Sequence, residues 1–536
     1  MTQEFDYIIA GAGSAGCVLA ARLIKAKAGK VLLLEAGGKD SSPFHKMPAT
    51  VVKVFQQKSW PYMTTPQKHC DNREMIVAQG KVLGGGSSVN GMIYIRGQRH
   101  DYDAWAQDWG CPGWAFKDVL PFFKRAEANA SLGGEYHNFN GPLPVSENHF
   151  RHPLTQALIR ASQDMGLPYV NDFNGWDQQG VGFYQATIQN GARASTAQTY
   201  LKSVQDNPDL SIVTDALVHK VVVKNGIATG VEYSTGDAGK GQTRSARARK
   251  EVIVSAGTIG SPKILLLSGI GPRAHLEELG IPVVADLPVG QNFHDHLHMS
   301  VNATINTENS FFGEDKGLKA VKHLLQWLTT RSGLMTSNVL EGGAFIDSTG
   351  SGRPDVQFHF LPLLDNFDNT PGEKAAAGAH GLTVKVGHVQ PKARGEIRLK
   401  SKDPHADIVI DPNYLGDPED VAGQTRAVQL GLKVLQQPSL KGLIKEIIEP
   451  AGVHWEDTAA IEKWMRKNIK TVYHPAGTCR IGQDAATSVT DTQLRVHGIK
   501  SLRVVDCSIC PQVPSGNTNA PSIMIGERGA AFILGH

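Results

Sequence analysis

The stretch that decides the fold reads FDYIIAGAGSAGCVLAARLIKAKAGKVLLLE and spans residues 5–35. The short apolar run Phe5–Ala10 predicts a buried strand, and Cys17–Lys25 has the composition of a helix. A second apolar run, Val31–Leu34, ends at the acidic residue Glu35. Strand, glycine turn, helix, strand and acid within about 30 residues form the pattern of a dinucleotide-binding βαβ unit.

Each special residue of this unit has a physical reason. Gly11 permits the tight turn, Gly13 lets the backbone approach a pyrophosphate, and Gly16 lets the helix pack closely on the strand. The helix N-terminus favours an anion, and Glu35 is placed to accept hydrogen bonds from ribose hydroxyls. The alternative, a glycine-rich surface loop without a ligand, leaves Glu35 unexplained. The position of the unit near the start of the sequence favours FAD over NAD.

Working outward, glycine is enriched in the whole chain. It accounts for 57 of the 536 residues, above the ~7% that is usual. Two further clusters, Gly80–Gly91 and Gly257–Gly271, suggest backbone that approaches a ligand. The second of them follows an apolar strand, Val252–Ser255, and Leu502–Val505 predicts another strand that ends at Asp506.

The middle of the chain lacks these glycine clusters. Val356–Leu361 and Gly395–Leu399 are predicted as strands and Ala427–Leu435 as a helix. We therefore expect a Rossmann-like α/β domain interrupted by an α+β domain. The expected boundaries are 1–148, 195–300 and 470–536 for the first domain, and 149–194 and 301–469 for the second.

Composition excludes several classes of protein. The net charge of +3 comes without a long block of one sign, which argues against a nucleic-acid partner. Six cysteines are too few for a disulfide framework and favour a reducing compartment. The acidic lead Met1–Asp6 argues against an export signal, and no apolar run reaches the length of a membrane span. A cytoplasmic location is expected, with peripheral contact at the inner membrane left open.

Several motifs in the same order identify a family. The runs Gly80–Asp103, Gly257–Gly271, Val31–Gly37 and His474–Cys479 resemble those of the glucose–methanol–choline (GMC) oxidoreductases. The chain is similar to bacterial FAD-dependent dehydrogenases of choline, alkanols and L-sorbose. The resemblance implies an FAD-binding domain assembled from separated segments and a substrate domain with an antiparallel sheet.

The resemblance also implies site residues. His474 matches the family's catalytic base, and Asn517 matches the second position, where an amide orients the alcohol oxygen. Glu341, Val472 and Tyr473 are expected in the substrate wall. Some relatives link FAD covalently to a His where this chain has Val89, so non-covalent FAD is expected. The expected cofactor contacts are Gly11, Gly13, Ser14, Ala15, Gly16, Glu35, Ala36, Val82, Gly86, Asn90, Gly91, Met92, Ile93, Val218, Ala256, Asp506, Cys507, Asn517 and Thr518.

Three other motifs have plainer interpretations. Cys507–Cys510 is a C-x-x-C, but it lacks the setting of a redox pair or of a zinc site. His294, His296 and His298 would share one face of a strand, and a loop element is preferred to a metal site. Leu324–Leu328 and the C-terminal apolar helix are expected to be core stripes rather than membrane anchors.

The predicted activity is FAD-dependent oxidation of a primary alcohol to the aldehyde, with His474 as base. The substrate could be a sugar or polyol such as L-sorbose, or an aliphatic or aromatic alcohol. The electron acceptor is expected to be a quinone or a similar molecule. Two alternatives stay open: an oxidase that uses O₂, and a non-redox flavoprotein similar to hydroxynitrile lyases.

Overall fold

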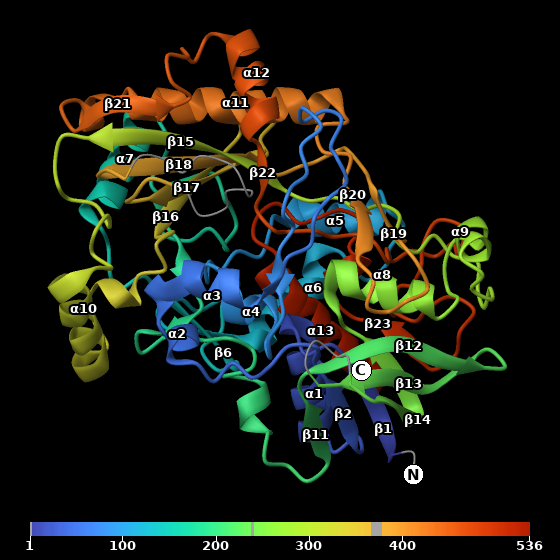
Figure 1. Cartoon of the computed structure of the whole chain (residues 1–536). Coiled ribbons are helices and arrows are strands. Elements are labelled where there is room, and N and C mark those ends of the chain that lie inside the picture. Colours follow the sequence, from blue (N-terminus) through green and yellow to red (C-terminus); the bar gives the residue numbers. More distant parts are fainter. Residues whose placement is uncertain (1–2, 237–240, 366–377) are drawn as a thin grey trace.

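Two large sheets form the frame of the molecule. The structure is a computed structural model that describes residues 3–236, 241–365 and 378–536. Figure 1 shows the first sheet around β1 and β14, beside the N-terminus, and the second sheet around β15–β18. The long helix α11 (Pro418–Leu435) lies across the outer face of the second sheet.

The first sheet contains the predicted βαβ unit. Its strand β1 lies in the centre and pairs in parallel with β2 on one side and β14 on the other. β11 extends the parallel part beyond β2, β23 pairs in parallel with β14, and β12 and β13 form an antiparallel extension. The bounds are β1 Gln3–Ala10, β2 Val31–Leu34, β11 Leu210–Val213, β12 Ala216–Lys224, β13 Ile227–Thr235, β14 Thr243–Val254 and β23 Leu502–Val504.

Two helices from opposite ends of the sequence pack together against this sheet. They are α1 (Ser14–Lys25) and α13 (Asn519–Leu534). The Ser14 hydroxyl donates to Asn519 Oδ1 at 2.8 Å, and Arg22 pairs with the buried carboxylate of Glu527. The C-terminal helix is thus part of the core, as expected from its apolar sequence.

The second sheet is antiparallel and comes from the middle of the chain. Its order is β21-β15-β18-β17-β16-β7, with β22 paired to the end of β15. Every residue of β17 is buried, because α11 and α7 (Pro153–Asp164) cover the sheet. The bounds are β7 Gly180–Phe183, β15 Leu297–Ile305, β16 Gly342–Ile346, β17 Val356–Leu361, β18 Gly381–His388, β21 Ile444–Glu449 and β22 Lys470–Thr471.

Short elements connect the two sheets. The small strands are β3 Ser59–Trp60, β4 Gln79–Gly80, β5 Glu127–Asn129, β6 Leu143–Glu147, β8 Gln185–Ala186, β9 Ile188–Gln189, β10 Ala192–Arg193, β19 Glu396–Leu399 and β20 Ile408–Asp411. The remaining helices are α2 Pro43–Lys46, α3 Val51–Gln57, α4 Gly86–Val89, α5 Arg99–Gln107, α6 Phe116–Ala126, α8 Gly257–Leu267, α9 Arg273–Glu278, α10 Gly317–Thr330 and α12 Thr458–Asn468.

Sequence and structure differ at some element ends. The predicted strand Val252–Ser255 is only the buried end of β14, which begins nine residues earlier, at Thr243, and ends at Val254. The predicted helix Ala427–Leu435 begins earlier, at Pro418, because Asp417 caps its first turn by accepting from Glu419 N–H. The division into two domains at the expected boundaries stays a prediction.

One expectation about the core is wrong. Leu324, Leu325 and Leu328 lie on α10 and are exposed rather than buried. Of the residues on this helix only Trp327 is buried, and its indole N–H donates to the Gly191 carbonyl at 2.7 Å. Among the described residues, no helix combines the length and the apolar character that crossing a bilayer requires.

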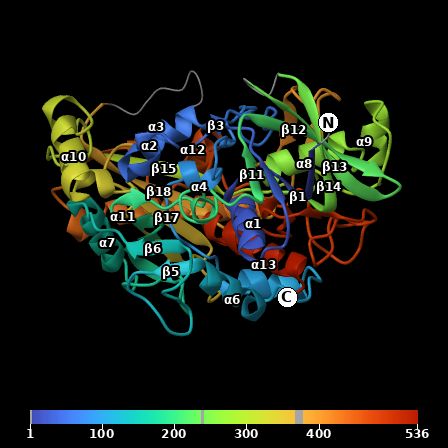
Figure 2. The same ribbon diagram turned by 90° about the horizontal axis from the view of Figure 1, so that it is seen from below.

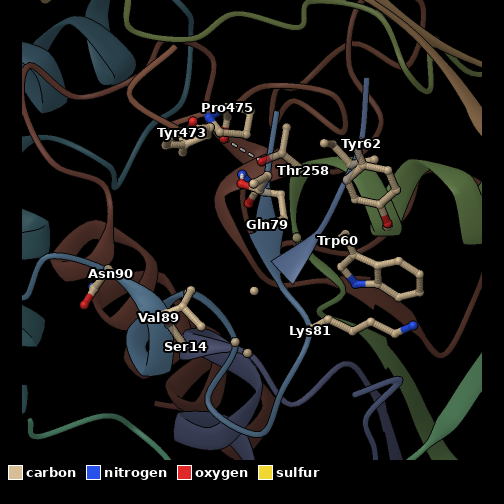
Figure 3. A pocket seen from close by; sticks show the side chains of 18 of the residues that line it. Ser14, Trp60, Tyr62, Gln79, Lys81, Val89, Asn90, Thr258, Tyr473 and Pro475 are labelled. Atoms are coloured by element: carbon tan, nitrogen blue, oxygen red, sulfur yellow. Dashed lines mark hydrogen bonds between the residues drawn. The ribbon is translucent and has the colours of Figure 1, made fainter. Parts of the chain in front are cut away.

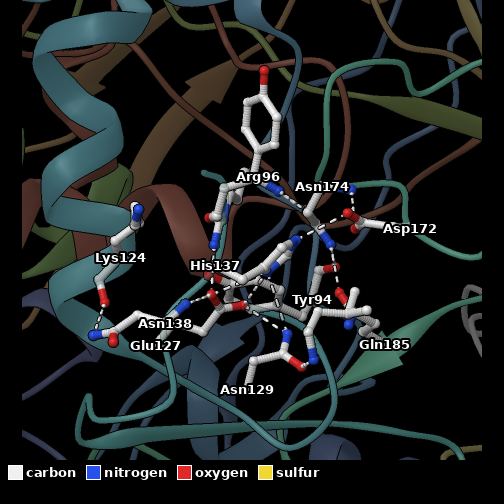
Figure 4. Close-up of polar contacts among 12 residues, drawn as sticks. Tyr94, Arg96, Lys124, Glu127, Asn129, His137, Asn138, Asp172, Asn174 and Gln185 are labelled. Atoms are coloured by element: carbon white, nitrogen blue, oxygen red, sulfur yellow. Dashed lines mark hydrogen bonds and ion pairs between the residues drawn. The ribbon is translucent and has the colours of Figure 1, made fainter. Parts of the chain in front are cut away.

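A buried charged network joins the segment before α5 to the region after α7 (Figure 4). His137 lies between two carboxylates, 3.0 Å from Glu127 and 2.9 Å from Asp172. Arg96 pairs with Glu127 at 2.8 Å, and the Arg96 N–H donates to Asn174 at 2.9 Å. The network therefore anchors the chain just beyond residues 90–93, which line the cavity described below.

Candidate active site

A cavity of about 680 Å³ lies between the two sheets. Both sheets and both ends of the chain supply its lining. Figure 3 shows Ser14, Val89 and Asn90 on one side, Trp60, Tyr62 and Lys81 on another, and Tyr473 and Pro475 facing them. A cavity of this size with a few polar groups is typical of cofactor and substrate sites.

The glycines at one end of the cavity, at the starts of α1 and α4, are of two kinds. A Cβ at Gly16 would lie 2.0 Å from the Gly11 carbonyl oxygen, so Gly16 is required for packing of the helix on the strand. A Cβ at Gly13 would have only the Ser255 carbonyl oxygen within 4 Å, at 4.0 Å, and one at Gly86 would meet nothing within that distance. Both line the cavity, so their missing side chains leave room for a ligand rather than for protein.

Glu35 closes this end of the cavity. Its carboxylate accepts from Ala12 N–H at 3.0 Å and from Gly37 N–H at 2.8 Å, which holds it beside the turn. Burial raises the pKa of Glu35 to about 7, although both backbone hydrogen bonds act in the opposite direction. The residues present therefore fit a dinucleotide: a turn without side chains, a helix N-terminus and an acid for the ribose.

Most of the predicted cofactor residues line this cavity. They are Gly11, Gly13, Ser14, Ala15, Glu35, Ala36, Gly86, Asn90, Gly91, Met92, Ile93, Val218, Ala256, Asp506, Cys507, Asn517 and Thr518. Gly16 and Val82 are not among the lining residues. Gly16 lies at the crossing of helix and strand, and Val82 is buried in a small apolar cluster with Val54 and Val89.

His474 and Asn517 lie together in the cavity. The Asn517 amide nitrogen is 3.4 Å from His474 Nε2, and the Asn517 oxygen accepts from Gln357 at 3.1 Å. Because Gln357 fixes the amide oxygen, the amide N–H₂ faces His474. Asp295 fixes the backbone by accepting from His474 N–H at 2.8 Å. Burial raises the pKa of Asp295 to about 7.

Neighbouring groups determine which nitrogen of His474 carries the proton. His296 Nε2 lies 3.1 Å from the Val389 carbonyl, which can only accept, so this nitrogen must donate. Burial lowers the pKa of His296 to about 3, so the ring is neutral and its Nδ1 is bare. His474 Nδ1 lies 3.3 Å from that bare nitrogen and donates to it. His474 Nε2 is then left without a proton, facing Asn517.

The electrostatic surroundings keep His474 neutral. Burial lowers the pKa of His474 well below its usual value. A neutral imidazole can accept a proton at neutral pH, which a protonated one cannot. The pair can therefore act as a proton acceptor with an adjacent hydrogen-bond donor.

The backbone of the cavity wall is strained at three places. Met92, Val339 and Tyr473 have φ angles of 59°, 70° and 63°, and all three line the cavity. Residues other than glycine rarely adopt such angles, and for the β-branched Val339 the conformation is an outlier. Backbone strain of this kind is found mostly at functional sites, because there the required position of a side chain outweighs the free-energy cost of the strained backbone.

Two of the three predicted substrate residues line the cavity, and one does not. Val472 and Tyr473 are in the lining, whereas Glu341 is fully buried elsewhere. Its carboxylate accepts from Ser337 Oγ at 2.6 Å and from His152 N–H at 2.7 Å, at the start of α7. Glu341 thus stabilises the N-terminus of α7 and does not form part of the cavity wall.

Sequence reasoning missed part of the lining. His298, His359 and Lys385 come from β15, β17 and β18 and face the cavity, and Trp60, Tyr62 and Lys81 lie near the βαβ unit. The Lys385 ammonium pairs with Asp365 at 2.9 Å, and Lys81 lies 3.9 Å above the Trp60 ring. Lys81 lies in the Gly80–Asp103 run and His298 in the histidine motif, but neither motif indicates a place in the cavity lining, and the other four residues belong to no motif.

The two rival motifs have structural roles. His294 accepts from Val513 N–H through Nε2 at 2.7 Å and is bonded at Nδ1 to the Asn292 carbonyl, so it does not converge with His296. Among the described residues, no group of three or more His, Cys, Asp or Glu could hold a metal ion. Cys507 and Cys510 are both free thiols, and burial raises the pKa of Cys510 well above its usual value.

Fold and cavity together define the class of the protein. It is a flavoprotein oxidoreductase with a Rossmann-like sheet and a second, antiparallel sheet on either side of the cavity. Family models described as GMC oxidoreductase match residues 5–298 and 391–526. The chain belongs to the GMC oxidoreductase family, whose members depend on FAD.

Relatives and solved structures agree with this assignment. The chain is 41% identical to an oxygen-dependent choline dehydrogenase of Sinorhizobium fredii, over 99% of this chain and 96% of that protein. It is 40% identical to an alcohol dehydrogenase [acceptor] of Pseudomonas putida, with the same coverage. The crystal structure of pyridoxine 4-oxidase from Mesorbium loti superimposes with a TM-score of 0.88 at 27% identity and covers 99% of both chains.

Proposed function

We propose that the chain oxidises a primary alcohol to the aldehyde, with FAD as its cofactor and with a quinone or another small molecule rather than O₂ as the final acceptor. The observation that carries the proposal is the bare Nε2 of His474 beside the Asn517 amide in a cavity fit for a dinucleotide. The relatives named alcohol and choline dehydrogenase support the alcohol as substrate.

The two side chains divide the work on the hydroxyl. A hydride can leave the carbon of an alcohol only if the O–H proton is also removed. His474 Nε2 takes that proton, and the Asn517 N–H donates to the oxygen and orients it. FAD bound in this cavity supplies the acceptor for the hydride. The alcohol would then leave as the aldehyde, with its hydroxyl proton on His474 Nε2 and its hydride taken up by the bound FAD.

The cofactor is held without a covalent bond at Val89. This residue lines the cavity, and its side chain has no nucleophilic atom that could attach to a flavin. Gly11–Ala15, Glu35 and Val218 would hold the adenosine and pyrophosphate end of FAD, and Asn90–Ile93 and Thr518 would hold the flavin end. Denaturation in acid releases the flavin to the supernatant if this is correct, and leaves it on the protein pellet if it is not.

The side chains near His474 favour a neutral alcohol over a quaternary ammonium. Lys385 lines the cavity, but its ammonium is paired with Asp365 at 2.9 Å, so the pair adds no strong net charge. Glu341, which could have attracted a cation, is turned away. A polyol or an aliphatic alcohol therefore suits the cavity better than choline.

An anaerobic panel of alcohols tests the proposal. The purified holoenzyme is mixed without oxygen with choline, L-sorbose, aliphatic alcohols and benzyl alcohol, and the absorbance of oxidised flavin is followed. We expect bleaching with at least one neutral alcohol, and slow recovery when air is admitted. Fast recovery in air identifies an oxidase instead. Cleavage of a cyanohydrin with unbleached flavin identifies a non-redox lyase, and the proposal is then wrong.

A further inference from the structure

Helix α10 stands out from the body of the molecule with an apolar face towards solvent. Figures 1 and 2 both show it at one end, beside α2 and α3 and away from the two sheets. Its exposed apolar side chains are Leu318 at 88%, Val321 at 52%, Leu325 at 55% and Leu328 at 53%. Spaced at i, i+3, i+7 and i+10, they form one continuous stripe along the helix.

The stripe is not a by-product of a loosely attached helix. Trp327 on another face of α10 is buried and bonded to the Gly191 carbonyl, and Arg331 stacks at 3.7 Å on its ring. Glu314 pairs with both Lys319 and His323 at 2.7 Å and ties the start of the helix. The helix is therefore held firmly on one side while its apolar stripe is exposed on another. Isolated exposed apolar residues are ordinary, but an ordered stripe marks an interaction surface.

Charge identifies what the stripe contacts. Lys316, Lys322 and Arg331 lie in or at the ends of α10, and Gly317–Thr330 contains no carboxylate. The carboxylate of Glu314 is already shared by Lys319 and His323, and Asp315 adjoins Lys316. Lys316, Lys319, Lys322 and Arg331 against Glu314 and Asp315 still leave a net charge of +2 on and beside the helix. An apolar stripe with lysines beside it matches a bilayer surface, whose acyl boundary takes the leucines and whose anionic headgroups take the lysines.

We propose that α10 docks the protein on a membrane surface containing anionic lipid. The stripe Leu318, Val321, Leu325 and Leu328 enters the headgroup boundary, and Lys316 and Lys322 contact lipid phosphates. α10 lies parallel to the surface and does not cross it, in keeping with its length and charge.

Docking at this place brings lipid near the cavity. The turn η4 (Leu334–Thr336), which follows α10, packs on η1 (Pro48–Thr50), and η1 leads into α3. On its inner side α3 supplies Val51, Val52 and Phe55 to the cavity lining. A bilayer on α10 therefore lies next to the wall through which an apolar alcohol or acceptor would pass.

Vesicle binding tests the proposal without depending on activity. Holoenzyme is sedimented with vesicles of phosphatidylcholine alone and of equal parts phosphatidylcholine and phosphatidylglycerol. We expect binding to the anionic vesicles, weakened by high salt, because exposed charges are screened. The double variant Leu318→Glu with Leu325→Glu should lower the vesicle affinity by roughly tenfold or more, because two apolar contacts are lost and two like charges are added.

A matched variant separates the stripe from exposed apolar residues in general. Ile227 and Val284 are exposed at 41% and 42% at the opposite end of the molecule, near β13 and α9. Ile227→Glu with Val284→Glu makes the same change of charge and should keep wild-type binding. Flavin absorbance and turnover of a soluble alcohol should stay normal in both variants, which shows that each is folded.

Three results overturn the proposal. The first is no binding of the wild type to either kind of vesicle. The second is equal binding by the two double variants. The third is a wild-type dimer by light scattering that the α10 variant converts to a monomer, because a second copy of the chain then covers the stripe.

Discussion

His474 has its proton on one defined nitrogen, and this makes its removal informative. In His474→Ala the base is lost while the Gly11–Ala15 turn and Glu35 remain, so the variant should bind FAD normally. General-base catalysis contributes about 10²- to 10⁴-fold, and we expect the rate of flavin reduction by alcohol to fall by that factor. Stopped-flow absorbance measures the rate. The exposed His454, replaced by alanine, is the control. An unchanged rate of flavin reduction in His474→Ala would show that His474 is not the base.

His296 acts on the alcohol only through His474. In His296→Phe the acceptor of the His474 Nδ1 proton is lost, and the ring can then carry its proton on Nε2 instead. A wrong tautomer costs up to about 10⁴-fold in serine proteases, so we expect at least a tenfold loss in kcat with little change in KM.

A double variant distinguishes positioning from a merely structural effect. If His296 works through His474, then adding His296→Phe to His474→Ala causes no further loss of rate. Independent losses that multiply would show that His296 has a separate role. FAD content, measured by the ratio of protein to flavin absorbance, should stay at the wild-type level throughout.

At the scale of the element, alanine substitutions at two glycines of the unit formed by β1 and α1 should have opposite effects on stability and on FAD affinity. Gly13→Ala places a methyl group into the cavity and touches no protein atom closely, so the apo protein should keep its stability within about 0.5 kcal/mol. FAD affinity should fall by about tenfold or more, because the methyl group occupies the place of the pyrophosphate.

Gly16→Ala is the same change three residues further on. Its Cβ would lie 2.0 Å from the Gly11 carbonyl oxygen, so helix and strand must move apart. We expect a loss of about 2 kcal/mol or more in the free energy of unfolding of the apo protein. Urea unfolding with a flavin titration measures both effects, and equal stability of the two apo variants would contradict this account of the turn.

The network around His137 predicts a pH-dependent contribution to stability. Burial disfavours the charged ring, but the hydrogen bonds of Asp172 and Glu127 outweigh it and raise the pKa of His137 above its usual value of 6.5. A raised pKa in the folded state stabilises the fold below pH 6.5, and this contribution is lost as the pH rises through the folded pKa. The pKa values of Glu127 and Asp172 are lowered, so their contribution is lost only in acid.

His137→Gln should therefore cost most between about pH 5 and pH 6.5, where the ring is charged and both carboxylates are ionised. Removing one partner of a buried ion pair costs about 3 kcal/mol. The difference in Tm between variant and wild type, measured from pH 5 to pH 9, should shrink towards alkaline pH. The exposed His454→Gln should show no such dependence, and a constant difference across the range would refute the charged state of His137.

At the scale of the whole molecule, the cavity makes the cofactor a part of the core. Residues of both sheets line it, so FAD should stabilise both together. A ligand at a thousand times its Kd adds about 4 kcal/mol to the free energy of unfolding. Hydrogen exchange of the apo and holo forms should show slower exchange in β1–β14 and in β15–β18 alike. Protection restricted to the first sheet would mean that the two sheets unfold independently.

How much the sequence predicts depends on how local each requirement is. The unit from β1 to Glu35 is predicted with all three element ends correct, although β1 begins two residues and α1 three residues earlier than expected. This is possible because each glycine and the acid meet a need of that same segment. Val356–Leu361 is likewise predicted with its observed ends, since its apolar residues alternate with Gln357 and His359 over the length of a strand. His474 and Asn517 are suggested by the family resemblance, and the structure brings them within 3.4 Å.

Other features depend on partners far away in the sequence. His359 and Lys385 lie on neighbouring strands, and the sequence does not show which face of each strand meets the cavity. The family resemblance places Glu341 in the substrate wall, yet its carboxylate accepts a hydrogen bond from His152 N–H at the start of α7. Leu324–Leu328 has the spacing of a core stripe, and spacing is the same whether a stripe faces protein or solvent.

The joining of α1 and α13 has a consequence for biosynthesis. Ser14 meets Asn519 and Arg22 meets Glu527, so the wall of the cavity near the glycine turn is complete only after α13 has been synthesised. The N-terminal βαβ unit must wait through translation of some five hundred residues. We therefore expect FAD to bind only after α13 has docked on α1. A folding helper or a fusion partner that delays docking of the last helix would yield protein with intact sheets and no yellow colour.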